Sequence, residues 1–358
     1  MDSFSTYVRD NVKVEIDELI RLGPVSVRMV SNVAPLQALQ YFSRAARKAF
    51  EGEPTQFELW CISLGAGNFD RGYLREHVDR SYRSDRFLEG YYVTDHFGPP
   101  LYLVSRGRHY YVFGEQFELV VWPYFVKYFL TLHALENDLL HIKAAALAIN
   151  SVGTLVIGRS GGGKSVFQLQ MCRSGAQFVT NTHTLIKDGR MSGVASAMRV
   201  RPGAWFAELA GMVSSTPSLK SGELNIDPYQ ILDAYSGNAV EVRNLCLVDY
   251  RPGRRTIDTI PEQMAYDYAE QFVLALNAYR LEEDLLDLYD NDSRRFVQTY
   301  ARMKAQLGNL IGQCRRYYIS CDILEPKNRD EVFSLLSEQG RCQRGPGRSG
   351  GGVKPSLR

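Results

Sequence analysis

The chain has 358 residues, with 42 lysines and arginines against 40 aspartates and glutamates, and 45% of its residues are hydrophobic. This composition is typical of a folded protein long enough for two domains, and it excludes a disordered chain, a collagen and a coiled coil as the main state. Residues 341–358 carry five basic side chains and no acidic one, so the preceding body has 37 basic against 40 acidic residues. A slightly acidic body has no net attraction to a nucleic-acid backbone or an anionic membrane, and we expect neither as a partner.

The cysteines and the N-terminal residues indicate the compartment. Six cysteines are scattered without a CxxC pair, and the start MDSFSTYVRDNVKVEIDELI lacks the basic and apolar regions of a signal peptide. These features predict a reducing, cytoplasmic location. The longest apolar stretch, residues 119–135, contains proline, lysine and histidine and is shorter than the roughly 20 residues that span a bilayer. We interpret it as a mostly buried helix.

Residues 1–120 predict a separate α+β domain that recognises a substrate or partner. Its apolar and polar residues alternate with periods of either a helix or a strand, and glycine and proline separate the segments. The expected helices cover 12–23 and 36–50, and the expected strands cover 25–30, 57–64, 90–98, 100–114 and 117–122.

The most informative segment is GRSGGGKS, residues 158–165, which fits the pattern GxxxxGK[ST] between the apolar strand TLVI and a predicted helix. Glycines let backbone N–H groups turn toward a β-phosphate at a helix N-terminus, where anions are favoured. Lys164 is expected to reach the β and γ oxygens of ATP, and Ser165 to bind Mg²⁺. The alternative is a glycine-rich turn that caps a helix and leaves the lysine in solvent. The predicted cofactors are ATP and Mg²⁺, and the predicted nucleotide-binding residues are Gly158, Ser160, Gly161, Gly162, Gly163, Lys164 and Ser165.

Around this segment, residues 136–190 resemble the HPr kinase/phosphorylase family, whose members phosphorylate protein or small-molecule hydroxyls. The family's P-loop strand is preceded by a strand that begins with a Leu-His pair, and LLHIKAAALAI takes that place here. The resemblance implies an α/β fold related to phosphoenolpyruvate carboxykinase. It implies an HPr kinase-like ATP-binding domain over 121–337. The Gly-, Arg- and Pro-rich composition of the end of the chain separately predicts a disordered basic tail over 338–358.

Two departures from the family concern its catalytic residues. The family's histidine falls on Lys143, and its pair of aspartates, one of which is the catalytic base, falls on Asn181 and Thr182. Neither Asn nor Thr accepts a proton at pH 7, so the role of general base does not transfer to these positions. Both can still orient a water molecule or a metal ligand.

Three hypotheses follow from the missing carboxylates. In the first, His183 is the base, because it lies two residues from Asn181 on an extended segment; a plain hydrogen-bonded strand residue is the alternative for this histidine. In the second, the acceptor is already an anion such as a carboxylate, so no base is needed. In the third, the site binds a nucleotide without turning it over.

Later residues supply further candidates. Asp249 follows the apolar strand NLCLV, where P-loop proteins place a metal-ordering carboxylate, although it also begins a DYRPG turn. Arg199 and Arg201 alternate along a strand and suit a phosphate or carboxylate of the substrate, although a solvated pair is the commoner case. Residues 261–289, 293–314 and 328–340 predict helices, and 317–324 predicts a strand.

The sequence thus predicts an α/β protein with an N-terminal α+β domain and a kinase-like domain. We expect it to transfer the γ-phosphoryl group of ATP to a hydroxyl of a small metabolite or peptide, with His183, Asn181 and Lys143 as catalytic residues. Ser165 and Asp249 are the metal ligands in this hypothesis, and Arg199 and Arg201 bind the substrate. The alternatives are a kinase acting on a carboxylate and a catalytically weak, nucleotide-binding regulatory protein. A homo-oligomer is compatible with the sequence.

Overall fold

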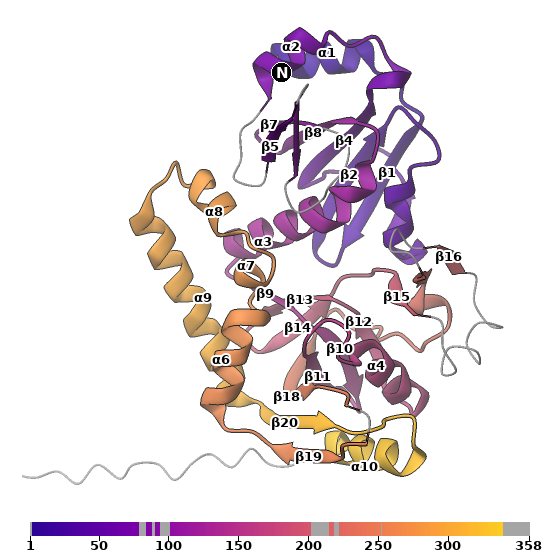
Figure 1. Cartoon of the computed structure of the whole chain (residues 1–358), viewed down its shortest axis with the longest axis vertical. Coiled ribbons are helices and arrows are strands. Elements are labelled where there is room, and N and C mark those ends of the chain that lie inside the picture. Colours follow the sequence, from indigo (N-terminus) through magenta and orange to yellow (C-terminus); the bar gives the residue numbers. More distant parts are fainter. Residues whose placement is uncertain are drawn as a thin grey trace, which may run out of the picture.

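The computed structural model of the chain describes residues 2–78, 84–87, 90–93, 101–201, 215–217, 222–251 and 253–338. It is a mixed α/β protein, as the sequence predicted. An N-terminal sheet lies on one side of helix α3, Lys127–Glu136, and a second sheet lies on the other side (Figure 1). Apart from residue 338, the predicted tail falls outside the described residues.

The N-terminal sheet has the strand order β3-β1-β2-β4-β8-β7 and is mixed, because β2, β4 and β8 run parallel while the other neighbours are antiparallel. Helices α1 and α2 cover one face, with Phe4 and Leu74 buried against Trp60 and Phe113. Its elements are α1 (Ser3–Asn11), β1 (Ile16–Leu22), β2 (Val25–Ser31), β3 (Arg47–Ala49), β4 (Phe57–Ser63), α2 (Arg71–His77), β7 (Tyr102–Arg106) and β8 (His109–Gly114), with β5 (Ser84–Phe87) and β6 (Gly90–Val93) paired apart from it.

Three predicted elements of this half are wrong. The expected helix over 12–23 is strand β1, because Gly23, at φ +63°, allows a tight turn that pairs β1 with β2. The expected helix over 36–50 forms two short 3-10 turns, Gln37–Tyr41 and Arg44–Ala46, followed by β3. Strand β1 pairs with β2 and with β3, and this pairing fixes the strand conformation of both mispredicted segments. The periodicity of a single segment cannot reveal its pairing partner.

The expected strand over 117–122 is also wrong, because the segment forms a 3-10 turn, Phe117–Leu119, and then a π-helical turn, Val121–Val126, that leads into α3. Short, mostly apolar segments of this kind give too few alternations to set a period, so periodicity alone cannot separate strand from helix. The helix predicted within 119–135 and the strands over 25–30, 57–64 and 100–114 are confirmed, the last as the β7–β8 hairpin.

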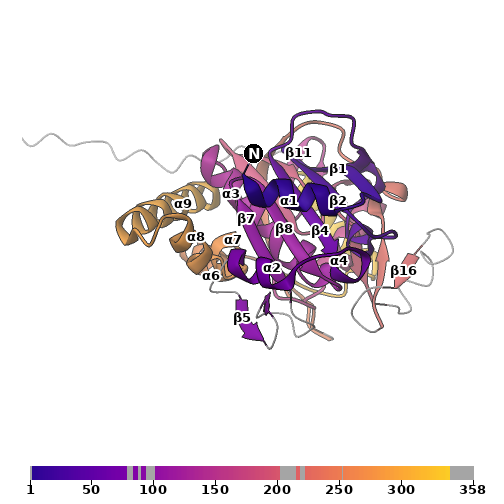
Figure 2. The same ribbon diagram turned by 90° about the horizontal axis from the view of Figure 1, so that it is seen from above.

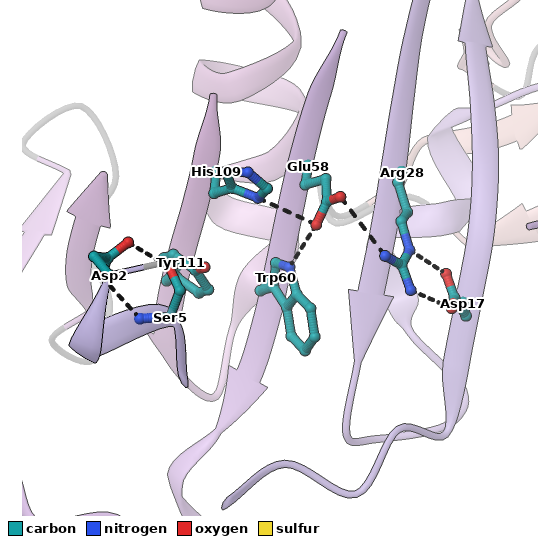
Figure 3. A network of polar contacts seen from close by, with 8 residues as sticks. All are labelled: Asp2, Ser5, Asp17, Arg28, Glu58, Trp60, His109 and Tyr111. Atoms are coloured by element: carbon teal, nitrogen blue, oxygen red, sulfur yellow. Dashed lines mark hydrogen bonds and ion pairs between the residues drawn. The ribbon is translucent and has the colours of Figure 1, made fainter. Parts of the chain in front are cut away.

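A ladder of polar side chains crosses the N-terminal sheet (Figure 3). Glu58 on β4 lies in register between Arg28 on β2 and His109 on β8. Its carboxylate lies 3.6 Å from Arg28 Nη1 and 3.2 Å from His109 Nδ1, and it accepts a hydrogen bond of 3.3 Å from Trp60 Nε1. Arg28 also donates two hydrogen bonds to Asp17 on β1. Cross-strand pairs of this kind stabilise the register of neighbouring strands.

The second sheet has the order β12-β10-β11-β18-β14-β13-β9, and β18 also pairs with β20, which pairs with β19. Strand β11 runs parallel to β18, with Ile157 opposite Leu247. Its strands are β9 (Leu140–Lys143), β10 (Ala145–Ile149), β11 (Val152–Ile157), β12 (Gln177–Thr180), β13 (His183–Lys187), β14 (Arg190–Gly193), β18 (Val240–Val248), β19 (Thr256–Thr259) and β20 (Arg315–Ser320), and a small antiparallel sheet adds β15 (Met198–Val200), β17 (Leu224–Ile226) and β16 (Ser215–Pro217).

Helices cover both faces of the second sheet. On one face Phe167 of α4 and Val332 of α10 pack on Val156, and on the other Met303 and Leu307 of α9 join the core that includes Leu155. Figure 2 shows α8 and α9 on one side of the molecule and β16 on the opposite side. These helices are α4 (Lys164–Arg173), α6 (Glu262–Phe272), α7 (Ala275–Ala278), α8 (Glu282–Leu288), α9 (Ser293–Gln313) and α10 (Pro326–Ser337).

One apolar core connects the two sheets through α3. Phe129 of α3 stacks on Phe57 of β4 with ring centroids 4.5 Å apart, and Thr131 of the same helix bonds His141 of β9. Buried residues from both sheets belong to the same cluster. A domain boundary near residue 120 therefore stays a prediction. In the part of the chain that the structure describes, no helix has both the length and the apolar character needed to cross a membrane.

Candidate nucleotide and acceptor site

The loop 158–163 joins the end of β11 to the start of α4, in the middle of the second sheet. Gly158 has φ +149°, and a Cβ on it would lie 2.2 Å from the carbonyl oxygen of Val248. Gly163 precedes α4 with φ +93°, and a Cβ there would lie 3.0 Å from the Cβ of Tyr250. The backbone N–H of Tyr250 donates to the Gly162 carbonyl. The loop therefore packs against the end of β18, which only glycine permits at these positions.

A cavity of about 350 Å³ opens beside this loop. Its described walls hold four cationic side chains and a single carboxylate, that of Glu223, so the cavity attracts anions. Gly158 and Gly162 are not among the lining residues. The lining residues are Lys143, Ala144, Ala145, Ser160, Gly161, Gly163, Lys164, Ser165, Val166, Asn181, Thr182, Arg199, Val200, Arg201 and Glu223.

Two lysines of the cavity have depressed pKa values. Lys164 Nζ donates hydrogen bonds of 2.9 Å to the carbonyl oxygens of Gly158 and Arg159. Burial, together with the charge of nearby Lys143, lowers the pKa of Lys164 to about 8. Burial also lowers the pKa of Lys143, whose ammonium lies 5.7 Å from the centroid of the Tyr279 ring. An anion between these ammonium groups would favour their charged forms and raise both pKa values.

Two oxygen atoms at the start of α4 suit a magnesium ion. Ser165 Oγ donates to Asn181 Oδ1 at 3.5 Å, and both side chains line the cavity. Hydroxyl and amide oxygens are hard ligands of the type that Mg²⁺ takes, and Mg²⁺ bound with a nucleotide needs few protein ligands. Among the described residues, no cluster of three histidine, cysteine or acidic side chains is placed to hold a metal.

Asp249, the other predicted metal ligand, follows β18 but does not line the cavity. Its carboxylate accepts hydrogen bonds from Arg251 Nε at 2.7 Å, Arg159 Nε at 3.1 Å and Tyr318 at 3.3 Å. Burial opposes ionisation of this carboxyl, but the two arginine hydrogen bonds outweigh it, so the pKa of Asp249 lies below its usual value. The structure thus gives Asp249 a role in closing the turn after β18, and release from both arginines would be needed before it reached a metal.

His183 does not lie with the other predicted catalytic residues. Its side chain is fully buried, with Nδ1 3.1 Å from His141 Nε2 and 3.2 Å from the Tyr279 hydroxyl, and its ring packs against Trp122. Burial lowers its pKa far below the usual range. Asn181 and Thr182 form a bend between β12 and β13, which breaks the period of two on which the prediction depended. This position corrects the expectation that His183 and Asn181 face the same acceptor.

The small sheet brings together residues that the sequence predicted and one that it did not. Arg199 and Arg201 line the cavity, and their guanidinium groups lie 4.0 Å and 3.2 Å from the Glu223 carboxylate. The Glu223 side chain is 12% exposed. Sequence reasoning missed Glu223, because SGELNI carries no clear strand pattern. The segment itself carries no signal that pairs it with Arg199, because the β15–β17 register joins residues more than twenty positions apart.

Comparisons with known proteins give little further information. No family model matches the chain, and no curated protein matches it. Among solved structures, the chain has a distant resemblance to the Hpr(Ser) kinase/phosphatase from Coxiella burnetii, with 16% sequence identity and a TM-score of 0.20. The matched region covers 34% of this chain and 76% of that structure.

Proposed function

We propose that the protein is an ATP-dependent phosphotransferase that acts on a hydroxyl group, with the 158–165 segment as its phosphate-binding loop. The observation that carries the proposal is the convergence of Lys143, Lys164, Arg199 and Arg201 on one cavity at the start of α4. Four cations beside backbone N–H groups at a helix N-terminus suit the charge of a triphosphate.

In this proposal each part of the cavity has its own contact with the nucleotide. The loop N–H groups surround the β-phosphate, and Lys164 leaves the loop carbonyls to meet the β and γ oxygens. Ser165 and Asn181 would hold Mg²⁺, which neutralises phosphate charge when it is bound. Lys143 lies on the same cavity and adds a second ammonium for the transferred group. When the nucleotide binds, Lys164 can exchange its hydrogen bonds with loop carbonyl oxygens for contacts with phosphate oxygens, because its carbonyl partners carry no charge.

The reaction forms one bond and breaks one. An acceptor oxygen bonds to the γ-phosphorus, the bond from that phosphorus to the β–γ bridging oxygen breaks, and ADP leaves with the electron pair. A hydroxyl acceptor also loses a proton. Glu223 takes that proton in our proposal, because it supplies the cavity's carboxylate within the described residues. Arg199 and Arg201, already beside Glu223, stabilise the charge on the transferred group.

The second candidate is a nucleotide-binding protein without turnover. The burial of His183 and the double ion pair of Asp249 favour it, because one predicted catalytic group and one predicted metal ligand are engaged elsewhere. A kinase for carboxylates remains a variant of the first candidate, in which no proton has to leave and the product is an acyl phosphate.

The deciding experiment follows the label from γ-labelled ATP. Purified protein, Mg²⁺ and a deproteinised metabolite extract are incubated, and labelled products are separated. We expect a labelled, hydroxylamine-resistant product that is absent with Lys164→Ala and unchanged with Lys327→Ala, a control lysine exposed at the start of α10. Tight ATP binding with no labelled product would support the second candidate and contradict the first.

A further inference from the structure

A second cavity of about 440 Å³ lies between the N-terminal sheet and the small sheet. Its size is in the range of small-molecule sites. One wall comes from β1 and the 3-10 turns after β2, and the other from residues around β15 and β17. The lining residues are Ile16, Glu18, Pro35, Leu36, Gln37, Leu39, Gln40, Phe42, Arg44, Arg47, Ala197, Asn225, Ile226, Asp227 and Gln230.

Asn225 is the residue that marks this cavity as a site. Asn225 is a lining residue and is 3% exposed, yet neither its amide nitrogen nor its amide oxygen has a hydrogen-bond partner among the described residues. Burying an amide without partners costs roughly 1–3 kcal/mol, so native proteins seldom keep one without a reason. A ligand that both accepts and donates a hydrogen bond would satisfy both atoms.

The acidic groups of the same cavity already have partners, and Arg44, its other cation, is exposed. Arg47 donates hydrogen bonds to both carboxylate oxygens of Glu18, at 2.8 and 2.9 Å. The Asp227 carboxylate accepts from the Ser43 hydroxyl and from the backbone N–H of Arg44. Leu36, Leu39 and Phe42 supply buried apolar surface. The buried part of the cavity therefore fits an uncharged polar molecule, since its acidic groups are matched by donors and the remaining cation, Arg44, is exposed.

The position of Asn225 connects this cavity to the cationic one. Asn225 lies opposite Arg199 in the β15–β17 pairing, and Glu223, the residue just before β17, has its carboxylate 4.0 Å from Arg199 Nη1. Directly opposite residues of an antiparallel pair share a face, and so do residues two apart. Arg199 and Asn225 therefore lie on one face of the small sheet, and the Glu223 carboxylate lies beside Arg199, with about 7 Å between Glu223 and Asn225 along the backbone.

We propose that this second cavity binds the phosphoryl acceptor, a neutral hydroxyl-bearing metabolite with a neighbouring hydrogen-bond donor and acceptor, such as an amide edge or two adjacent hydroxyls. Asn225 recognises that pair and directs the reacting hydroxyl toward Glu223. This inference rests on the proposed function and adds the class of acceptor to it. Transfer proceeds as described above, with the hydroxyl proton passing to Glu223.

Asn225→Leu is the test variant, because leucine has a similar volume and makes no hydrogen bonds. Asn244→Leu is its matched control: Asn244 is also buried on a strand, but its amide bonds Thr154, Arg315 and the Leu336 carbonyl. We expect Asn225→Leu to keep or raise the melting temperature of the full chain and Asn244→Leu to lower it. A drop of similar size in both would show that the Asn225 amide has partners in the free protein, such as ordered water, and would overturn the proposal.

A second experiment measures the transfer of label from γ-labelled ATP across a dilution series of the metabolite extract. Asn225→Leu should require at least tenfold more extract for half-maximal incorporation, with the plateau and the affinity for an ATP analogue retained. The same extract dependence in wild type and Asn225→Leu would contradict the acceptor cavity alone. No transfer by the wild type at any dilution would instead contradict the proposed function.

Discussion

His141 and His183 lie side by side in the core between α3 and the second sheet, with Nε2 of the first 3.1 Å from Nδ1 of the second. Both are fully buried, and burial lowers the pKa of His141 to about 3 and that of His183 well below its usual value. In the unfolded chain each has a pKa near 6.5. The pair is therefore neutral in the folded protein over a pH range in which the unfolded chain takes up protons.

The first prediction is a loss of stability in acid that belongs to this pair. As the pH falls below about 6.5, only the unfolded state is protonated, so the free energy of unfolding should fall by up to about 1.4 kcal/mol per pH unit for each histidine. Above pH 6.5 the pair adds no pH dependence. Urea titrations between pH 4.5 and 7.5 would compare wild type with the double variant His141→Gln, His183→Gln. The variant should show a shallower slope, and equal slopes would contradict neutral histidines in the fold.

The second prediction concerns the pH dependence of nucleotide binding. Lys164 has a pKa of about 8 before binding, and a triphosphate raises it. Affinity should be flat below pH 8 and decrease above it, because binding then requires uptake of a proton. Calorimetry with a non-hydrolysable ATP analogue, in two buffers of different ionisation enthalpy at pH 8.5, measures that uptake. Lys164→Arg keeps its charge at every pH and should weaken the dependence, leaving the part that comes from Lys143. An affinity that stays constant to pH 9.5 in the wild type would count against Lys164 as the phosphate ligand.

The third prediction tests the packing of the loop on β18. Gly158→Ala places a methyl group 2.2 Å from the Val248 carbonyl oxygen, at a φ that alanine rarely adopts. We expect a loss of about 3 kcal/mol in the free energy of unfolding, from overpacking together with backbone strain. Gly107→Ala, in the β7–β8 turn at φ +63° with open space around it, isolates the strain and should cost about 1 kcal/mol. Chemical denaturation measures the free energy of unfolding of both variants. Equal losses would show that the loop shifts to accommodate the methyl group at little cost.

The fourth prediction separates a hydroxyl acceptor from a carboxylate. If Glu223 takes a proton, Glu223→Gln should lower kcat on the order of 10²- to 10⁴-fold while leaving the affinity for an ATP analogue within about threefold. With a carboxylate acceptor no proton leaves, so the same variant should keep its rate, and hydroxylamine should trap the product. The matched control is Glu331→Gln on α10, whose carboxylate bonds Arg255 outside the described walls of either cavity.

The parts of the site encoded by consecutive residues could be predicted from the sequence. The strand before the loop, its glycines and the helix that begins at Lys164 all depend on local conformational preferences, and the observed elements agree with them. The alternation of Arg199 and Arg201 likewise places both on one face, and both line the cavity. Their roles in binding stay predictions.

The parts of the site that depend on pairing between distant segments of the chain could not be predicted from the sequence. The bend at Asn181 and Thr182 turns the His183 side chain into the core, and the residues NTHT contain no glycine or proline that would predict a bend of the chain there. Glu223 becomes part of the cavity because β17 pairs with β15 across more than twenty residues of sequence. Residues 12–23 likewise have a helical periodicity, but pairing with β2 stabilises the strand conformation instead.

Helix α3 limits how the protein can respond to a substrate. Six consecutive residues, 129–134, are buried on all sides, between Phe57 of the N-terminal sheet and His141 of the second. Many kinases close over their substrates by swinging one lobe about a hinge of a few exposed residues. Here such a movement would expose the buried side chains of α3 to water, and the free energy required is far larger than that of a hinge rotation. If the protein closes around a bound ligand, the movement must therefore come from small elements such as the β15–β17 sheet, while the two large sheets keep a fixed distance.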